Sequence, residues 1–445
     1  MALKITVIGT GYLGATHAAA MAEMGFEVLG LDVVPEKIET LAAGRVPMYE
    51  PGLEELLAKH VAGFEGSSGR LRFTTSWEEL ESFGGNVHFV CVNTPQKRAD
   101  YGCDMSYVDS AFTALAPRVR AGSLVVGKST VPVGSAERLA GLLPEGVGLA
   151  WNPEFLREGF AVRDTLHPDR IVVGVRPEDG ERAEKLLRAV YAAPIAEGSP
   201  LVVTDFPTAE LVKTAANSFL ATKISFINAM AEVCEAAGGD VVRLAEAIGY
   251  DERIGNKFLR AGIGFGGGCL PKDIRAFMAR AGELGADQAL TFLREIDSIN
   301  MRRRGQMVEM TREILGGSSF LGRQVAVLGA TFKPDSDDVR DSPALNVAGQ
   351  IHLQGAQVTV YDPKGMDNAR KVFPTLSYAD SALEAVRGAD VVLHLTEWRE
   401  FRELDPAELA SAVASPVLLD GRNALDAERW RAAGWTYRAM GRPRA

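Results

Sequence analysis

A cysteine follows a glycine-rich stretch in the second half of the chain, within the segment Gly-Ile-Gly-Phe-Gly-Gly-Gly-Cys-Leu-Pro-Lys-Asp at residues 262–273. Pro271 suits the first position of a helix, so Cys269 is predicted to lie at a helix N-terminus, with Lys272 nearby. Both features favour the thiolate over the thiol. A thiolate can capture an aldehyde, so the segment predicts nucleophilic chemistry, the alternative being a cysteine that only packs.

Two further groups of residues could support that chemistry. The segment Asn-Pro-Glu-Phe-Leu-Arg-Glu at 152–158 follows a predicted strand and places two carboxylates, Glu154 and Glu158, at a strand end. Lys213 and Asn217 are four residues apart in a predicted helix, so their side chains project from one face. Thioester hydrolysis needs a base for water and a donor for the oxyanion. On spacing alone, a solvated lysine beside a neutral asparagine remains the alternative.

A glycine-rich turn near the N-terminus predicts a dinucleotide site. A β-branched strand at 4–8 leads into the spacing G-x-G-x-x-G and a predicted helix at 12–25, and the next strand, 27–32, ends in Asp32. The glycines of the turn are Gly9, Gly11 and Gly14. They allow a pyrophosphate to approach the helix N-terminus, while Asp32 would accept a ribose hydroxyl and repel a 2′-phosphate. NAD is therefore expected rather than NADP, the alternative being a turn without a ligand.

The strand–helix alternation continues as a doubly wound parallel sheet. Further strands are predicted at 87–92, 123–126 and 148–151. Three hydroxyl side chains lie at their carboxyl ends, where ligands of parallel sheets bind: Thr94, Ser129 and Thr130. Residues 122–129 match the phosphate-loop pattern G-x-x-x-x-G-K-S, but they are themselves a strand and no helix follows directly, so no phosphate loop is predicted.

A long helix and a second, related α/β part follow. From residue 207 to about 237 there is no interior Gly or Pro, which gives a helix of about 45 Å that suits a spine between two domains. The first pattern then recurs, with a strand at 325–329, a helix at 345–353 and a strand at 357–362 that ends in Asp362. Lys333 and Arg340 follow the first of these strands and fit a phosphate ligand, or are two surface cations beside an acidic loop.

Composition narrows the class of protein. The chain has 445 residues, of which 47% are hydrophobic and 24% charged, with a net charge of −10, so a nucleic-acid binder is not expected. No run approaches the roughly 18–20 apolar residues of a membrane span. The four cysteines, Cys91, Cys103, Cys234 and Cys269, form no C-x-x-C pair, so neither a disulfide framework nor a metal site is expected. We see no signal-peptide pattern and expect a cytoplasmic protein.

Together these segments resemble the UDP-glucose/GDP-mannose dehydrogenase family. The matching motifs, in family order over nearly the whole chain, are V-I-G-T-G-Y-L-G at 7–14, V-N-T-P at 92–95, S-T-V-P-V-G at 129–134, N-P-E-F-L-R-E-G at 152–159, E-L-V-K-T-A-A-N-S-F at 210–219, G-F-G-G-G-C-L-P-K-D at 264–273 and F-K-P-D-S-D-D-V-R-D-S-P at 332–343. Gly268 stands where many relatives have Ser or Tyr, which we expect to be without consequence.

The resemblance implies an NAD-dependent double oxidation at C6 of UDP-glucose to UDP-glucuronate, through a thiohemiacetal and a thioester on Cys269. It implies Glu154 as the base of hydrolysis, Lys213 and Asn217 as oxyanion donors, Asp273 as the residue that positions water, and Thr130 beside them. The implied NAD site comprises Gly9, Gly11, Tyr12, Leu13, Gly14, Asp32, Lys37, Thr94, Thr130, Glu158, Lys272 and Arg340. The implied sugar-nucleotide site comprises Glu154, Phe155, Leu156, Arg157, Glu158, Lys213, Asn217, Phe258, Leu259, Arg260, Ala261, Gly262, Gly266 and Lys333.

The expected architecture is two Rossmann-like doubly wound domains joined by a helical central domain. We place an NAD-binding domain at 1–204, a central domain for dimerisation and catalysis at 205–318, and a UDP-sugar-binding domain at 319–445. The resemblance implies a homodimer built on the long helix. Three alternatives stay open: the same chemistry on GDP-mannose or another UDP-hexose, a single oxidation of a hydroxyacid that would not need Cys269, and a non-enzymatic NAD-binding or P-loop regulatory protein.

Overall fold

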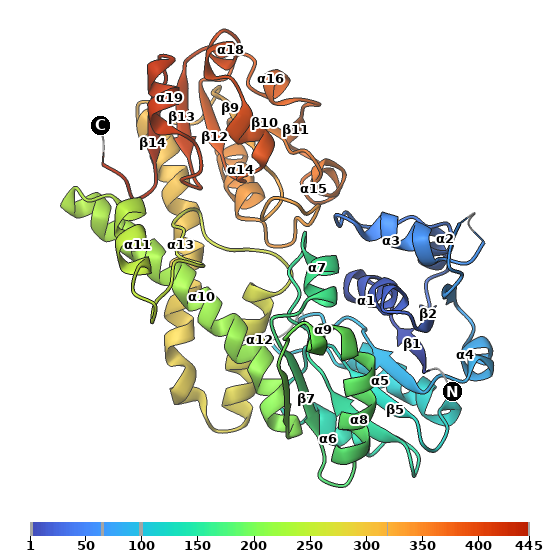
Figure 1. Ribbon diagram of the computed structural model, residues 1–445. Helices are drawn as coiled ribbons and strands as arrows, with labels where there is room; N and C mark the ends of the chain where they lie inside the picture. The colour runs from blue at the N-terminus through green and yellow to red at the C-terminus, as the bar shows by residue number, and fades with distance from the viewer. Residues whose placement is uncertain (1–2, 64–65, 98–100, 318, 444–445) are drawn as a thin grey trace. The chain divides into compact units, whose positions relative to one another are not determined.

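The computed structural model describes residues 3–63, 66–97, 101–317 and 319–443 (Figure 1). By their internal contacts these residues divide into two units. The first contains the chain up to Ala216 together with Arg275–Leu284, and the second contains Asn217–Ile274 together with the chain from Gly285 onward. Each unit is built around one sheet.

An eight-stranded sheet forms the framework of the first unit, in the order β3-β2-β1-β4-β5-β6-β7-β8. Its strands are β1 (Lys4–Ile8), β2 (Glu27–Leu31), β3 (Leu71–Thr74), β4 (Val87–Val90), β5 (Leu124–Gly127), β6 (Gly148–Trp151), β7 (Ile171–Val175) and β8 (Leu201–Thr204). Neighbours pair in parallel, except that β6 and β7 are antiparallel. The order 3-2-1-4-5-6 of the first six strands is that of a dinucleotide-binding sheet.

Short helices cover both faces of this sheet. They are α1 (Tyr12–Glu23), α2 (Pro35–Ala42), α3 (Leu53–His60), α4 (Trp77–Phe83), α5 (Ser106–Leu115), η1 (Ala116–Arg118), α6 (Ser135–Ala140), α7 (Ala161–Leu166), α8 (Gly180–Val190) and α9 (Ala192–Ala196). Helix α1 is rich in alanine and almost completely buried, since small side chains let it approach the sheet closely. It packs against both α3 and α7, which places the start of α1 beside those two elements.

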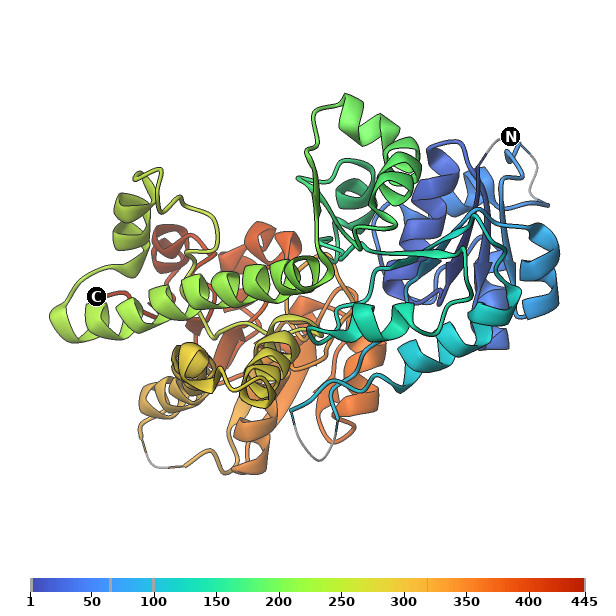
Figure 2. The ribbon, with the colours of Figure 1, turned by 90° about the horizontal axis from the view of Figure 1, so that it is seen from below.

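Helices dominate the middle of the chain. They are α10 (Phe206–Ala237), α11 (Val241–Gly249), α12 (Leu270–Glu283), η2 (Asp287–Leu290) and α13 (Thr291–Ile314). Figure 2 shows α10 as one unbroken helix, whose 32 residues span about 48 Å. The predicted spine helix is thus confirmed. Among the residues that the structure describes, no helix is both long enough and apolar enough to cross a membrane.

A six-stranded parallel sheet forms the framework of the second unit, in the order β11-β10-β9-β12-β13-β14. Its strands are β9 (Gln324–Leu328), β10 (Gln357–Tyr361), β11 (Ser377–Tyr378), β12 (Val391–His394), β13 (Val417–Asp420) and β14 (Thr436–Ala439). The helices between them are α14 (Pro343–Leu353), α15 (Met366–Val372), α16 (Ala382–Ala385), α17 (Arg399–Glu403), α18 (Pro406–Ala410) and α19 (Ala427–Ala432). This strand order repeats that of the first sheet, so the predicted fold class is confirmed.

Candidate active site

The glycine-rich turn between β1 and α1 is shaped for close approach of a ligand. Gly9 has a φ of +85°, and a Cβ at Gly14 would lie 1.8 Å from the Gly9 carbonyl oxygen, so both positions require glycine. A Cβ at Gly11 would meet only the Asn93 side chain, at 3.8 Å. The turn is therefore open at Gly11, beside the N-terminus of α1, where N–H groups favour a phosphate.

Asp32 follows β2 and faces this turn. Its Oδ2 accepts hydrogen bonds from the Thr10 N–H at 2.8 Å and from Lys37 Nζ at 2.7 Å. Burial would raise the pKa of Asp32, but the hydrogen bonds from Lys37 and Thr10 outweigh it, and the pKa lies below its ordinary value. The sequence prediction placed Asp32 and Lys37 in one site, and the structure brings them together as an ionised carboxylate and its counter-charge.

The loops after β4 and β5 meet at the carboxyl end of the first sheet. Thr94 Oγ1 donates to the Thr130 carbonyl at 2.9 Å, and Ser129 Oγ donates to the Val92 carbonyl at 2.6 Å. All three predicted hydroxyl residues therefore lie at one edge, which is where parallel sheets bind ligands.

The predicted base and one predicted oxyanion donor form a buried ion pair. Glu154 Oε1 lies 2.9 Å from Lys213 Nζ, and the two side chains are 13% and 5% exposed. The other oxygen, Oε2, accepts the Leu156 N–H at 2.9 Å. Lys213 Nζ also lies 5.7 Å from the Phe155 ring, so its charge faces both a carboxylate and an aromatic surface. Arg157, in contrast, pairs with Asp164 at 2.6 Å.

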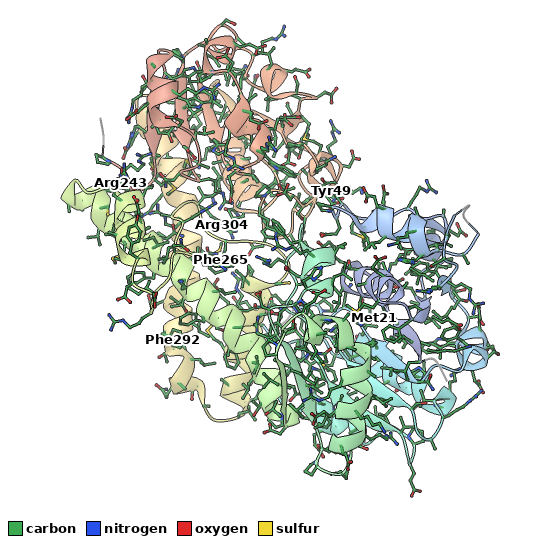
Figure 3. All side chains as sticks on the ribbon, in the orientation of Figure 1. Met21, Tyr49, Arg243, Phe265, Phe292 and Arg304 are labelled. Carbon is green, nitrogen blue, oxygen red and sulfur yellow. The ribbon has the colours of Figure 1, made fainter. Side chains whose placement is uncertain are left out.

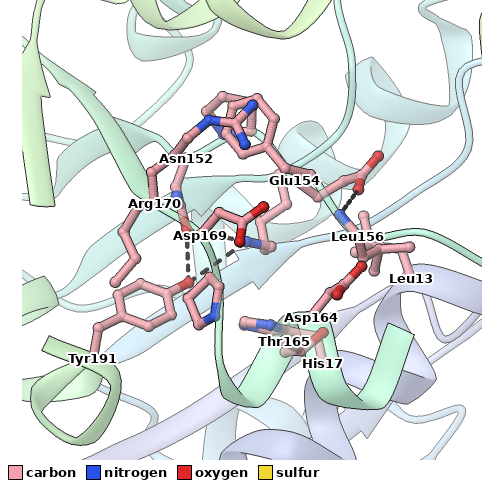
Figure 4. A pocket seen from close by; sticks show the side chains of 15 residues that line it. Leu13, His17, Asn152, Glu154, Leu156, Asp164, Thr165, Asp169, Arg170 and Tyr191 are labelled. Carbon is pink, nitrogen blue, oxygen red and sulfur yellow. Dashed lines mark hydrogen bonds between the residues drawn. The ribbon is translucent and has the colours of Figure 1, made fainter. Parts of the chain in front are cut away.

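A cavity of about 60 Å³ adjoins Glu154 and is lined by polar groups that the sequence analysis missed (Figure 4). Lys128 Nζ donates to Asn152 Oδ1 at 3.0 Å, and the Tyr191 hydroxyl donates to the same oxygen at 2.6 Å. Burial lowers the pKa of Lys128 to about 8. His17 is 1% exposed, and neither ring nitrogen has a hydrogen-bond partner in the described part of the chain. A lysine directly after a buried strand was the available signal, and it lay inside the rejected phosphate-loop match.

Cys269 lies at the N-terminus of α12, in the second unit. Its carbonyl accepts the Asp273 N–H at 2.8 Å, so it precedes the helix directly, and the thiol is exposed. The helix begins at Leu270, one residue before the predicted start. Asp273 is buried and accepts from Asn217 Nδ2 at 2.7 Å, and its other oxygen lies 3.2 Å from Lys272 Nζ. The structure thus joins three predicted site residues just behind the cysteine.

The other cysteines differ from Cys269 in their surroundings. Cys91 follows the end of β4 by one residue, where the sequence predicted a strand position, and burial raises its pKa to about 12. Burial also raises the pKa of Cys234 in α10. Neither thiol is set to ionise near neutral pH.

The glycine-rich loop before Cys269 is fixed by buried amide and guanidinium groups. The Asn300 side chain accepts from the Phe265 N–H at 2.7 Å and donates to its carbonyl at 3.0 Å, while Arg304 donates to the same carbonyl at 3.2 Å (Figure 3). Arg422 donates to the Gly264 carbonyl at 2.9 Å. No sequence pattern pointed to these three residues, because they act from distant parts of the chain.

Other predicted sugar-nucleotide residues lie on loops of the second unit. Phe258 has a φ of +63°, which is uncommon for a bulky residue and typical of functional loops. After it, Leu259 and Ala261 are buried and Arg260 is exposed. Lys333 Nζ lies 5.7 Å from the Phe332 ring, beyond the end of β9.

Comparison with known proteins places the whole chain. Three models of the UDP-glucose/GDP-mannose dehydrogenase family match it: the NAD binding domain at residues 3–195, the central domain at 207–302 and the UDP binding domain at 326–427. The chain belongs to the UDP-glucose/GDP-mannose dehydrogenase family. The predicted resemblance is confirmed, and the turn, Asp32 and the open face at Gly11 all lie within the family's NAD binding domain and fit that cofactor.

Individual relatives agree with this assignment. The UDP-glucose 6-dehydrogenase of Rhizobium meliloti (strain 1021) is 42% identical over 99% of this chain and 100% of its own. A UDP-glucose dehydrogenase structure from Pyrobaculum islandicum has a TM-score of 0.87 at 37% identity, covering 98% of each chain. A UDP-D-ManNAc dehydrogenase structure from Pyrococcus horikoshii has a TM-score of 0.85 at 28% identity, covering 100% of each chain.

The one departure from the family pattern is placed next to a predicted cofactor residue. A Cβ at Gly268 would lie 2.3 Å from the guanidinium carbon of Arg340, which pairs with Asp338 at 2.6 Å. The loop and Arg340 also share a backbone bond, from the Gly267 N–H to the Arg340 carbonyl, at 2.9 Å. We expected Gly268 to be without consequence, yet in this family member it is what lets Arg340 rest on the loop before Cys269.

Proposed function

We propose that this protein oxidises the C6 hydroxyl of UDP-glucose to a carboxylate with two molecules of NAD, releasing UDP-glucuronate. Family membership and the full-length likeness to UDP-glucose 6-dehydrogenases support this activity. The observation that carries the four-electron reaction is an exposed cysteine at a helix N-terminus in a chain that also has an NAD turn. A single alcohol oxidation would not need a thiol that retains the aldehyde.

The proposed mechanism gives each residue a separate task. When bound, NAD accepts the hydride in each oxidation. The Cys269 thiolate adds to the C6 aldehyde, and loss of the second hydride from that adduct leaves a thioester. Lys213 and Asn217, on successive turns of α10, donate to the carbonyl oxygen as negative charge develops. Glu154 takes the proton from water as it adds to the thioester, and the thiolate leaves as the carboxylate forms.

Several observations support these roles. Lys213 already holds a carboxylate and has little exposure, so its charge acts in a poorly solvated setting. Asp273 holds the Asn217 amide, which orients that donor. The test is the ratio of NADH formed to UDP-glucose consumed: we expect two, and a ratio of one would reject the double oxidation.

The alternative substrates are other nucleotide sugars. The structural likeness to a UDP-D-ManNAc dehydrogenase makes a UDP-N-acetylhexosamine the second candidate. The match to a UDP binding domain favours a uridine over a guanosine nucleotide. Rates of NADH formation with UDP-glucose, UDP-N-acetylmannosamine and GDP-mannose would rank them, and we expect UDP-glucose to be oxidised fastest.

We also propose a homodimer that uses the long helix. Phe219, Phe226 and Val233 are exposed on α10 at seven-residue intervals, and Phe292 is exposed at the start of α13. A stripe with this spacing suits helix packing against a second copy. We expect light scattering to give twice the chain mass, and Phe226→Lys to lower it to that of one chain.

The domain division and location complete the proposal. The three family models fall within the NAD-binding domain at 1–204, the central domain at 205–318 and the UDP-sugar-binding domain at 319–445, which supports that division. A cysteine nucleophile works only while reduced, so the mechanism favours the cytoplasm.

A further inference from the structure

Glu50 is a buried carboxylate that lies between α2 and α3. It is 4% exposed. Its Oε2 accepts the Gly159 N–H at 2.7 Å, and its Oε1 accepts the Ala161 N–H at 2.7 Å. Within the described residues, no basic side chain lies within 4.0 Å of it. Glu50 therefore serves backbone donors at the end of the 154–159 loop and the start of α7.

The same carboxylate also contacts the glycine-rich turn. Tyr12 is the first residue of α1, and its hydroxyl donates to Glu50 Oε2. The Gly159 N–H lies 3.0 Å from the Tyr12 oxygen as well, so the three groups form one cluster. Burial, followed by the Glu50 hydrogen bond, raises the pKa of Tyr12, so its hydroxyl remains a donor.

The 154–159 loop is thus held at both ends. At its start, Asn152 donates to the Val172 carbonyl at 2.7 Å and accepts from Lys128 and Tyr191. At its end, Glu50 holds Gly159. Between these anchors lie Glu154 and Glu158, the proposed base and a proposed NAD contact.

We propose that Glu50 is a positioning residue that fixes this loop against the NAD turn through Tyr12, so that the cofactor site and Glu154 keep one spacing. The inference rests on the proposed function. It requires a carboxylate, because the two backbone N–H groups each need an acceptor oxygen. A glutamine would present one amide N–H₂ to a backbone N–H and leave that donor unsatisfied.

The test compares Glu50→Gln and Tyr12→Phe with a matched control, Glu55→Gln, which makes the same change at an exposed position on α3. For Glu50→Gln we expect kcat to fall roughly 10- to 100-fold, the cost of a small misplacement of catalytic groups. The KM for NAD should rise as well. Hydrolysis should slow more than either oxidation, so intact-mass spectrometry should find the thioester on Cys269 accumulating during turnover.

Tyr12→Phe keeps the proposal falsifiable if Glu50→Gln does not fold, because it removes only the hydroxyl. We expect it to raise the KM for NAD, and its effect should be smaller when Glu50→Gln is already present. Glu50→Gln with unchanged kcat and KM, at any melting temperature, would reduce Glu50 to a structural cap and overturn the proposal. Failure of the proposed function would instead appear in the wild type, as an NADH ratio other than two.

Discussion

The ammonium of Lys213 lies 2.9 Å from the carboxylate of Glu154, with both side chains largely withdrawn from solvent. Removing one partner would leave the other buried without its counter-charge. Lys213→Met should therefore lower the free energy of unfolding by roughly 3–5 kcal/mol. Adding Glu154→Gln should restore much of that loss, and urea denaturation measures both. A double variant no more stable than Lys213→Met would contradict the pairing.

Replacing the cysteine should separate the two oxidations. Cys269→Ser should lose steady-state turnover by several orders of magnitude, since a serine hydroxyl is un-ionised at neutral pH and no base is set to activate it. The first hydride transfer needs no thiol, so up to one NADH per site should still form. Rapid-mixing absorbance at 340 nm, read against product, measures this, and Cys103→Ser is the control. A variant that still yields two NADH per sugar at the wild-type rate would refute the thioester mechanism.

Removing the charge at Asp32 should relax the choice of cofactor. Asp32→Asn loses a charged acceptor for the ribose hydroxyl, which should weaken NAD by about 1–3 kcal/mol. Lys37 then lacks the carboxylate that now holds it at 2.7 Å, and can meet a 2′-phosphate instead. We expect the ratio of kcat/KM for NAD over NADP to fall. Unchanged constants for both cofactors would move the NAD site away from the Gly9 turn.

A side chain at Gly268 should act on the cofactor through Arg340. Gly268→Ala puts a methyl group where the guanidinium now rests, and a flexible arginine can move aside without unfolding the loop. We expect a nearly unchanged melting temperature and a KM for NAD raised about 10-fold, the loss of one charged contact. Gly282→Ala, whose Cβ would enter open space in α12, is the control. Equal kinetics for the two variants would exclude a role of Arg340 in binding NAD.

His17 should make the stability of the first unit depend on pH. Burial, assisted by the Lys128 charge, holds the pKa of His17 well below its ordinary value. As pH falls through about 6.5, the unfolded chain gains a proton that the folded chain does not, so the wild type loses stability. His17→Phe cannot titrate, and it removes two buried nitrogens that lack partners. Its advantage in melting temperature should therefore grow from pH 8 to pH 5, and a constant difference would contradict this assignment.

The sequence predicted the elements that repeat a simple pattern. The β1–α1–β2 unit, its recurrence in β9–β10 and the helix α10 were recognisable because strands buried on both faces are continuously apolar, and because glycine and aspartate mark the turns between them. Strands β7 and β8 were missed, and with them the antiparallel pairing of β6 and β7. That reversal depends on which edge receives the next strand, which local residue patterns do not encode.

The site was predictable where chemistry needs a rare residue at a fixed place, as with Cys269 and Asp32. The buried polar supports were not. Glu50, Lys128 and Asn300 are separated in the chain from the groups they hold by tens of residues, and each would pass for a surface residue in the sequence. Burial and pairing are properties of the folded chain, so only the structure could assign them.

The two sheets end their second strands with the same residue, yet only one of these aspartates has bonding capacity left. Asp362 accepts from two backbone N–H groups of its turn, from Thr331 Oγ1 and from the Trp398 indole, while its other oxygen accepts two more N–H groups. Asp32 Oδ1 accepts only the Val34 N–H, at 3.2 Å. A duplicated scaffold has thus turned one ribose acceptor into a fixed brace. An inhibitor built around an adenosine diol would accordingly find a single receptor in the molecule, although the architecture offers two.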